Sequence, residues 1–143
     1  MSPGQFDPVL VRRHLLALDR ALQNLRRHAG RPIEALLNDP DEEWIVERGL
    51  QLCAQNALDI ATHLSVSGGR GTPDYATAID GLGALGILPR PFAHRFRGIA
   101  GFRDLIVHGY LDVDPNRVHE LLNHRLDDFV AFASYIEAHL KGG

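Results

Sequence analysis

The chain has 143 residues, of which 45% are hydrophobic and 23% are charged, and its formal net charge is −3. These values are typical of one globular domain and exclude a disordered or fibrous chain. They also exclude a protein that holds nucleic acid by bulk positive charge. The single cysteine, Cys53, allows no internal disulfide and no cysteine cluster for zinc, which favours a reducing, cytoplasmic location. No stretch reaches the ~20 apolar residues of a membrane span, and no signal-peptide pattern is seen.

The charges are segregated along the chain. Residues 1–38 sum to +3, residues 39–66 to −5, residues 67–110 to +2, and the remainder to −3. Four arginines and one acid lie between positions 90 and 108. Arginine binds phosphate through planar, bidentate contacts, although a GC-rich genome also explains why 14 of the 15 basic residues are arginine. The distribution of charge therefore allows a local anion site that the net charge alone disfavours.

Helical periodicity runs through nearly the whole chain, and no segment alternates apolar and polar residues as a half-buried strand does. The first helix is expected at 7–28, with Pro8 in its first turn and the run 30–32 ending it. A second helix is expected after the acidic run 39–43, because these acids suit a positive N-terminal dipole. The apolar stripes of the two helices are Leu15, Leu18, Leu22 and Leu25, and Val46, Leu50, Cys53, Ala57, Ile60 and Leu64.

The second half of the chain is expected to add three helices. A loop at 67–73 precedes a short helix at 73–85, and a fourth helix runs from Pro89 or Pro91 to His108. A fifth helix begins at Asp114 and Pro115, which have the character of an N-cap and a first helical residue. Its apolar stripe is Val118, Leu122, Phe129, Ile136 and Leu140. Four long helices and one short helix predict a single all-α domain over 1–143, an antiparallel bundle.

Three patterns that often mark cofactor or metal sites are weak in this sequence. Residues 81–86 match GxGxxG, but the preceding residues are predicted to be helix rather than strand, so these glycines are typical of a helix end. The glycine-rich loop at 67–73 lacks the GK[ST] of a phosphate loop. The eight histidines include no i, i+4 pair and no HExxH motif. We therefore expect no cofactor and no metal.

The predicted fourth helix carries the most informative pattern. At ~100° per residue, one of its faces is formed by Phe92, Phe96, Ile99 and Ile106. Arg103 falls in the middle of this face. A cation on a buried face is costly unless it is paired or borders a polar cleft. Two interpretations fit equally: an arginine paired with an acid of the second helix, or an arginine held in a concave site for an anion.

Further candidate residues stand at the end of this helix. His108 lies ~160° around a straight helix from the apolar face, away from Arg103, unless Gly109 ends the helix and redirects it. Asp104 is four residues before His108, so its carboxylate either orients the imidazole or forms a weak surface pair with it. Tyr110 follows, at a position where most tyrosines only pack at an interface.

The run Phe102–Tyr110 has the form Arg-x4-His-x-Tyr and resembles the signature of the HepT family of HEPN domains. These are ribonuclease toxins paired with a minimal nucleotidyltransferase antitoxin. The resemblance covers most of the chain from about residue 42 to 140. Further similar runs, corresponding to the second helix, the third helix and the turn after it, are 47–52, 57–63, 73–75 and 85–89.

This resemblance implies a HEPN-like helical bundle that forms a homodimer and brings two copies of the motif to a shared cleft. It implies metal-independent RNA cleavage, with Arg103 and His108 as the catalytic pair. It also implies that the antitoxin adenylylates Tyr110. Asp104 is a supporting residue at a position where the family often has asparagine, and its negative charge would lower RNA affinity or the cleavage rate.

The residue types suit that chemistry, and three hypotheses remain open. RNA supplies its own 2′-hydroxyl nucleophile, so the site needs proton transfer by His108 and charge stabilisation by Arg103. The first hypothesis is a toxin endoribonuclease neutralised by a nucleotidyltransferase antitoxin. The second is a non-catalytic HEPN module that binds a nucleotide or the partner enzyme. The third is a structural bundle in which Arg103 and His108 merely pair.

Overall fold

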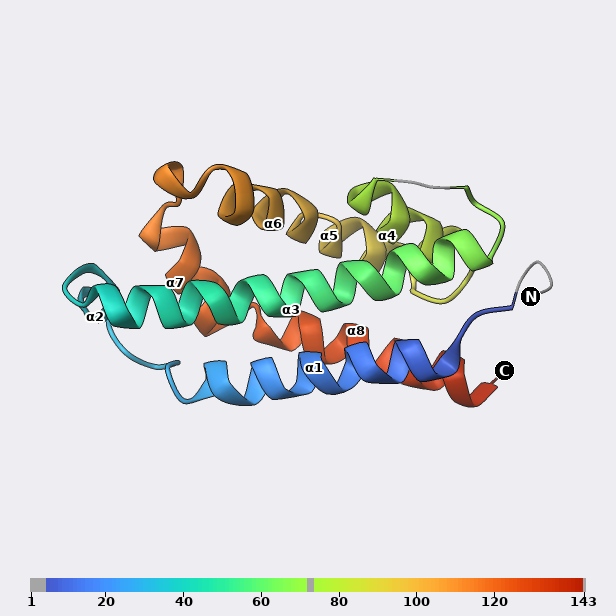
Figure 1. The fold of residues 1–143 in the computed structure, drawn as a ribbon, viewed down its shortest axis with the longest axis horizontal. Helices are drawn as coiled ribbons and strands as arrows, with labels where there is room; N and C mark the ends of the chain where they lie inside the picture. The colour runs from blue at the N-terminus through green and yellow to red at the C-terminus, as the bar shows by residue number, and fades with distance from the viewer. Residues whose placement is uncertain (1–4, 72–73, 143) are drawn as a thin grey trace.

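The 28-residue helix α3 (Pro40–Ser67) runs the length of the molecule and packs against α1, α2, α4, α6, α7 and α8 (Figure 1). The computed structural model describes residues 5–71 and 74–142. Within these residues there is no strand, so the predicted all-α class is confirmed. The other elements are α1 (Pro8–Arg26), α2 (Glu34–Leu37), α4 (Tyr75–Ala84), α5 (Arg90–Phe96), α6 (Ile99–His108), the 3-10 helix η1 (Tyr110–Asp112), α7 (Pro115–His124) and α8 (Leu126–Gly142).

Aspartate caps begin the two long helices of the first half, α1 and α3. The side chain of Asp7 accepts hydrogen bonds from the first turn of α1, and Asp39 does the same for α3. Helix α3 begins at Pro40, so three of the acids that were predicted to precede it, those at 41–43, lie in its first turn. The apolar stripes predicted for both helices are buried against one another. Helix α2 and η1 were not predicted, because elements this short carry no periodicity.

The single helix predicted from Pro89 or Pro91 to His108 is two helices, α5 and α6. Arg97 and Gly98 separate them. Glycine weakens a helix at this point because of its large backbone entropy. The prediction of one straight helix is therefore wrong.

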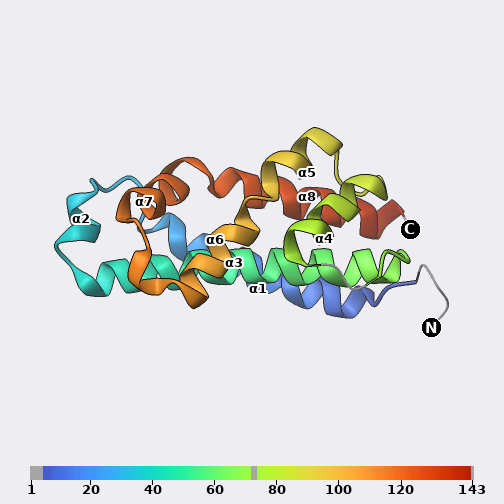
Figure 2. The same ribbon diagram turned by 90° about the horizontal axis from the view of Figure 1, so that it is seen from above.

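The two halves are separated because they pack on different partners. Phe92 of α5 lies 5.2 Å from Tyr135 of α8, measured between ring centroids, and Phe96 lies 5.0 Å from Phe132. Helix α6 packs on α3 instead, and both α5 and α6 contact α4. Figure 2 shows the same division, with α5 beside α8 and α6 over α3. The break at Gly98 changes the phase of the residues that follow it.

The helix predicted from Asp114 onward is also interrupted. Helix α7 ends at His124 and α8 begins at Leu126. Arg125 between them bonds Asp128 through its Nε at 2.9 Å, which ties the break to the first turn of α8. Helix α7 packs on α2 and α3, whereas α8 packs on α1 and α3. No helix in the described ranges is both long enough and apolar enough to span a membrane.

Candidate active site at the end of helix α6

Helix α6 and the short helix η1 after it carry all the residues that were predicted for the site, namely Arg103, Asp104, His108 and Tyr110. Arg103 and Asp104 lie in the middle of this ten-residue helix, and His108 is its last residue. Gly109 caps it, donating its N–H to the carbonyl of Leu105 at 2.8 Å. The prediction that Gly109 ends the helix is therefore confirmed.

The guanidinium of Arg103 is hydrogen-bonded at its Nε edge and lies over an aromatic ring. Its Nε donates to Oε1 of Gln55 on α3 at 2.8 Å, and its Cζ lies 5.1 Å from the ring centroid of Tyr75 on α4. Its Nη1 lies 3.2 Å from Oδ1 of Asp104. The side chain is 19% exposed. Of the two interpretations, pairing with an acid of the second helix is wrong, because α3 supplies an amide at this position.

Gln55 connects Arg103 to two further side chains. Its Nε2 donates to Oδ1 of Asp59 at 2.8 Å and to the hydroxyl of Tyr75 at 3.2 Å. No role in the site was predicted from the sequence for Gln55, Asp59 or Tyr75. A signal for the first two existed: they are polar residues at i, i+4 on a helix whose neighbouring positions are buried and apolar.

The structure does not bring all four predicted residues together within one chain. Asp104, whose side chain is 60% exposed, contacts Arg103. Among the described residues, no hydrogen bond or ion pair joins His108 to Asp104 or to Arg103. His108 is exposed, and Tyr110 at the start of η1 is 71% exposed. The hypothesis that Arg103 and His108 merely pair is wrong.

The cap of α4 lies beside the site. Asp74 precedes Tyr75, and its Oδ1 accepts the Thr77 N–H at 2.7 Å. The hydrogen bonds from Thr77, with a smaller contribution from the positive charge of Arg97, lower the pKa of the Asp74 carboxyl from its ordinary value. The negative charge at the start of α4 is thus stabilised by the helix that presents Tyr75 to Arg103.

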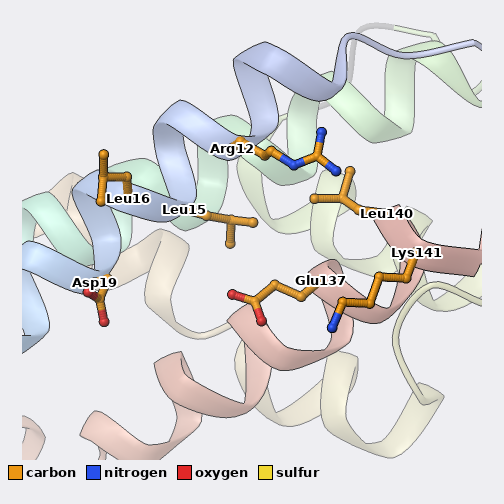
Figure 3. A pocket seen from close by; sticks show the side chains of 7 residues that line it. All are labelled: Arg12, Leu15, Leu16, Asp19, Glu137, Leu140 and Lys141. Atoms are coloured by element: carbon orange, nitrogen blue, oxygen red, sulfur yellow. The ribbon is translucent and has the colours of Figure 1, made fainter.

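No predicted site residue lines the other cavities described here. In the parts of the chain that the structure describes, no three His, Cys, Asp or Glu side chains are grouped so as to hold a metal ion. A groove of about 400 Å³ lies between α1 and α8 (Figure 3), on the side of α3 away from α6 (Figure 1). Its lining residues are Arg12, Leu15, Leu16, Asp19, Glu137, Leu140 and Lys141.

A helical bundle with an Arg-x4-His-x-Tyr run at the end of one helix defines a HEPN-type domain. Within that class, the chain belongs to the Ribonuclease HepT-like family, which matches residues 18–136. The glycines at 81–86 belong to the end of α4 and the turn after it, as predicted.

Two named relatives are similar along the sequence. The chain is 28% identical over 136 residues to the tRNA nuclease HepT of Aphanizomenon flos-aquae, a match that covers 94% of this chain and 92% of that protein. It is 27% identical over 90 residues to the mRNA nuclease HepT of Shewanella oneidensis, covering 62% of this chain and 68% of that protein.

Solved structures share the fold. The tri-AMPylated HEPN toxin of Shewanella oneidensis, in complex with its MNT antitoxin, superposes with a TM-score of 0.80 at 21% identity, covering 90% of this chain and 97% of that one. YutE of Bacillus subtilis, a cytosolic protein of unknown function, gives a TM-score of 0.81 at 15% identity, covering 96% and 92%.

Proposed function

We propose that this protein is a toxin that cleaves RNA without a metal ion, using Arg103 and His108 in the cleft of a homodimer. The observation that carries the proposal is that neighbouring side chains fix the guanidinium of Arg103. Gln55 and the Tyr75 ring hold the guanidinium in place, and among residues 5–71 and 74–142 the other recorded polar partner of its donor fork is Asp104. A planar fork fixed in this way is suited to the non-bridging oxygens of a phosphodiester. Both named relatives are nucleases of RNA, which supports RNA as the substrate.

The chemistry needs two proton transfers around one phosphorus atom. The 2′-hydroxyl oxygen attacks the phosphorus and gives its proton to one imidazole, while a second imidazole donates a proton to the departing 5′ oxygen. A 2′,3′-cyclic phosphate and a 5′-hydroxyl result. Each chain supplies one His108, which is exposed at the end of α6, and a symmetric dimer supplies two. Arg103 stabilises the charge that develops on the pentacovalent phosphorus.

We further propose that a nucleotidyltransferase antitoxin silences the enzyme by adenylylating Tyr110. The phenolic oxygen would attack the α-phosphorus of ATP and release pyrophosphate. Tyr110 is 71% exposed and lies two residues after His108, so a partner enzyme has access to it. The added phosphate places a bulky anion beside the site and excludes RNA by occupancy and repulsion. A cytoplasmic location for the pair agrees with the single free, buried Cys53.

The contact between Asp104 and Arg103 favours one alternative. A carboxylate on Nη1 competes with the scissile phosphate, which favours a HEPN module that binds its partner enzyme without cleaving RNA over one that holds a nucleotide phosphate at Arg103. Growth inhibition and RNA cleavage in the absence of the antitoxin distinguish the two functions. A catalytic toxin shows both, and a binding module shows neither.

The experiment compares wild type with His108→Ala and Arg103→Ala on tRNA and mRNA, in the presence of EDTA. His124→Ala is the matched control, because it removes an exposed histidine at the end of another helix. We expect cleavage to fall by about 10²–10⁴-fold in the first two variants and to stay unchanged in the control. Wild-type cleavage by His108→Ala would overturn its role, and loss of wild-type activity in EDTA would overturn metal independence.

A further inference from the structure

Gln55 lies between one group that only donates hydrogen bonds and one that only accepts them. The Nε–H of Arg103 is 2.8 Å from Oε1 of Gln55, and Oδ1 of Asp59 is 2.8 Å from Nε2. A guanidinium has no acceptor, and an ionised carboxylate has no donor. The amide is the neutral group that satisfies both, and its orientation follows: the oxygen faces Arg103 and the nitrogen faces Asp59.

The second N–H of the amide is also used. It donates to the hydroxyl of Tyr75 at 3.2 Å, and the Arg103 guanidinium lies over the ring of the same tyrosine, with its Cζ 5.1 Å from the ring centroid. Tyr75 therefore holds the arginine directly through its ring and indirectly through Gln55. Every polar atom of the Gln55 side chain has a partner, so the amide is fixed in one orientation.

Three helices meet at this amide. Gln55 and Asp59 project from α3, Tyr75 is the first residue of α4, and Arg103 belongs to α6. Of these four residues, only Arg103 belongs to the Arg-x4-His-x-Tyr run. Because Gln55 occupies the Nε edge, the Nη groups, one of which contacts the exposed carboxylate of Asp104, are the part left to meet a ligand.

We propose that Gln55 is a positioning residue: its amide, oriented by Asp59 and Tyr75, holds the Nε edge of Arg103 and aims the Nη edge at the scissile phosphate. This inference rests on the proposed function, since it assigns the arginine to RNA cleavage. Gln55 itself touches no reacting atom in this arrangement. Its effect is exerted on the orientation of Arg103, which has to be maintained through the transition state.

A swap of charges tests the donor and acceptor pattern. Gln55→Leu removes the hydrogen bond to Nε of Arg103. Gln55→Glu keeps an acceptor for Arg103 but turns a second oxygen toward the carboxylate of Asp59. The double variant Gln55→Glu/Asp59→Asn restores the match, because the new amide donates to the new carboxylate. Gln23→Leu is the control, since Gln23 donates to Asp19 at 2.8 Å in a similar pair on the surface of α1.

We expect kcat for RNA cleavage to fall roughly 10- to 100-fold in Gln55→Leu and in Gln55→Glu, with KM changed much less. The double variant regains most of the lost kcat, and the control keeps wild-type values. A merely structural role predicts equal damage in the single and double variants, and no such rescue. Thermal unfolding of each variant shows whether the fold is intact.

A second readout is independent of catalysis. The Nε–H of Arg103, assigned in ¹H–¹⁵N spectra by its loss in Arg103→Lys, should exchange slowly in wild type and in the double variant and quickly in Gln55→Leu. If Arg103→Ala is inactive while folded Gln55→Leu and Gln55→Glu keep wild-type kcat, the positioning role is overturned and the proposed function stands. If Arg103→Ala cleaves RNA at the wild-type rate, the proposed function fails and this role falls with it.

Discussion

Oδ1 of Asp104 lies 3.2 Å from Nη1 of Arg103, the residue immediately before it. The carboxylate therefore occupies part of the guanidinium edge that Gln55 and Tyr75 leave open. The Asp104 side chain is 60% exposed, so solvent screens the pair, and such contacts are worth about 0.2–1 kcal/mol. Any phosphate that binds Arg103 has to displace this carboxylate or accept its repulsion.

Asp104→Asn should therefore strengthen RNA binding. Removing the competing charge lowers KM by up to about fivefold, the equivalent of the pair's modest free energy. The measurement is KM for RNA cleavage at two salt concentrations, with a smaller gain expected at high salt because of screening. Asp112→Asn, which neutralises an exposed acid in η1, is the control. An increase in KM for Asp104→Asn would mean that the carboxylate supports the site.

Tyr110→Phe should separate toxicity from neutralisation. The variant lacks the phenolic oxygen that we propose as the acceptor of the adenylyl group but keeps Arg103 and His108, so it should cleave RNA at a rate within about twofold of wild type. Co-expression with the antitoxin should no longer protect cells, and mass spectrometry should find no AMP on this peptide. The control is Tyr135→Phe, which changes a tyrosine packed against Phe92. This variant should still be modified on Tyr110. Full protection of cells that express Tyr110→Phe would contradict the assignment.

The motif could be predicted from the sequence because its members lie within one short run. The contacts of Gln55 and Tyr75 with Arg103 could not be predicted. Gln55 is 48 positions away from Arg103 along the chain, and a helix pattern does not reveal which side chains of two helices meet. The breaks at Gly98 and Arg125 were missed for a related reason. Both flanking segments keep helical periodicity, and the break reflects a change of packing partner that only the tertiary structure shows.

A buried carboxylate joins the end of α1 to the start of α3. Glu42 is 7% exposed, and its Oε1 lies 2.8 Å from Nδ1 of His28 and 2.9 Å from Nη1 of Arg31. Glu42→Gln leaves both partners without a charged acceptor and should lower the free energy of unfolding by about 1–3 kcal/mol. Urea unfolding measures this change, and Asp41→Asn in the same turn should cost less than about 0.5 kcal/mol. Equal losses in the two variants would argue against a specific role for Glu42.

Cys53 should be chemically silent in the folded protein. Burial raises the pKa of its thiol to about 12, so almost no thiolate exists at about pH 8. A thiol reagent should react with the native protein no faster than the protein opens, and rapidly in denaturant. The same shift destabilises the fold only at high pH: a raised pKa contributes stability below the ordinary value of 9.0, which is lost as pH rises toward 12. Fast native-state labelling at about pH 8 would contradict this burial.

Acid should weaken the start of α4 through Asp74. The pKa of this carboxyl is lowered from 3.8 by its hydrogen bonds with Thr77. A lowered pKa contributes stability that is fully present above the ordinary value and is lost as pH falls through the folded-state value. Asp74→Ala should therefore lower Tm at about pH 6, with a difference from wild type that shrinks as the pH falls below about 4.

Asp74→Asn distinguishes the charge from the cap. Asparagine also accepts the Thr77 N–H but does not titrate, so its Tm advantage over Asp74→Ala should stay constant with pH. Thermal unfolding followed by circular dichroism across this range measures all three proteins. The cap matters for the site because α4 begins at Tyr75, whose ring lies against Arg103. A difference between wild type and Asp74→Ala that grows in acid would reverse the sign of this linkage, and the proposed stabilisation of the Asp74 charge would be wrong.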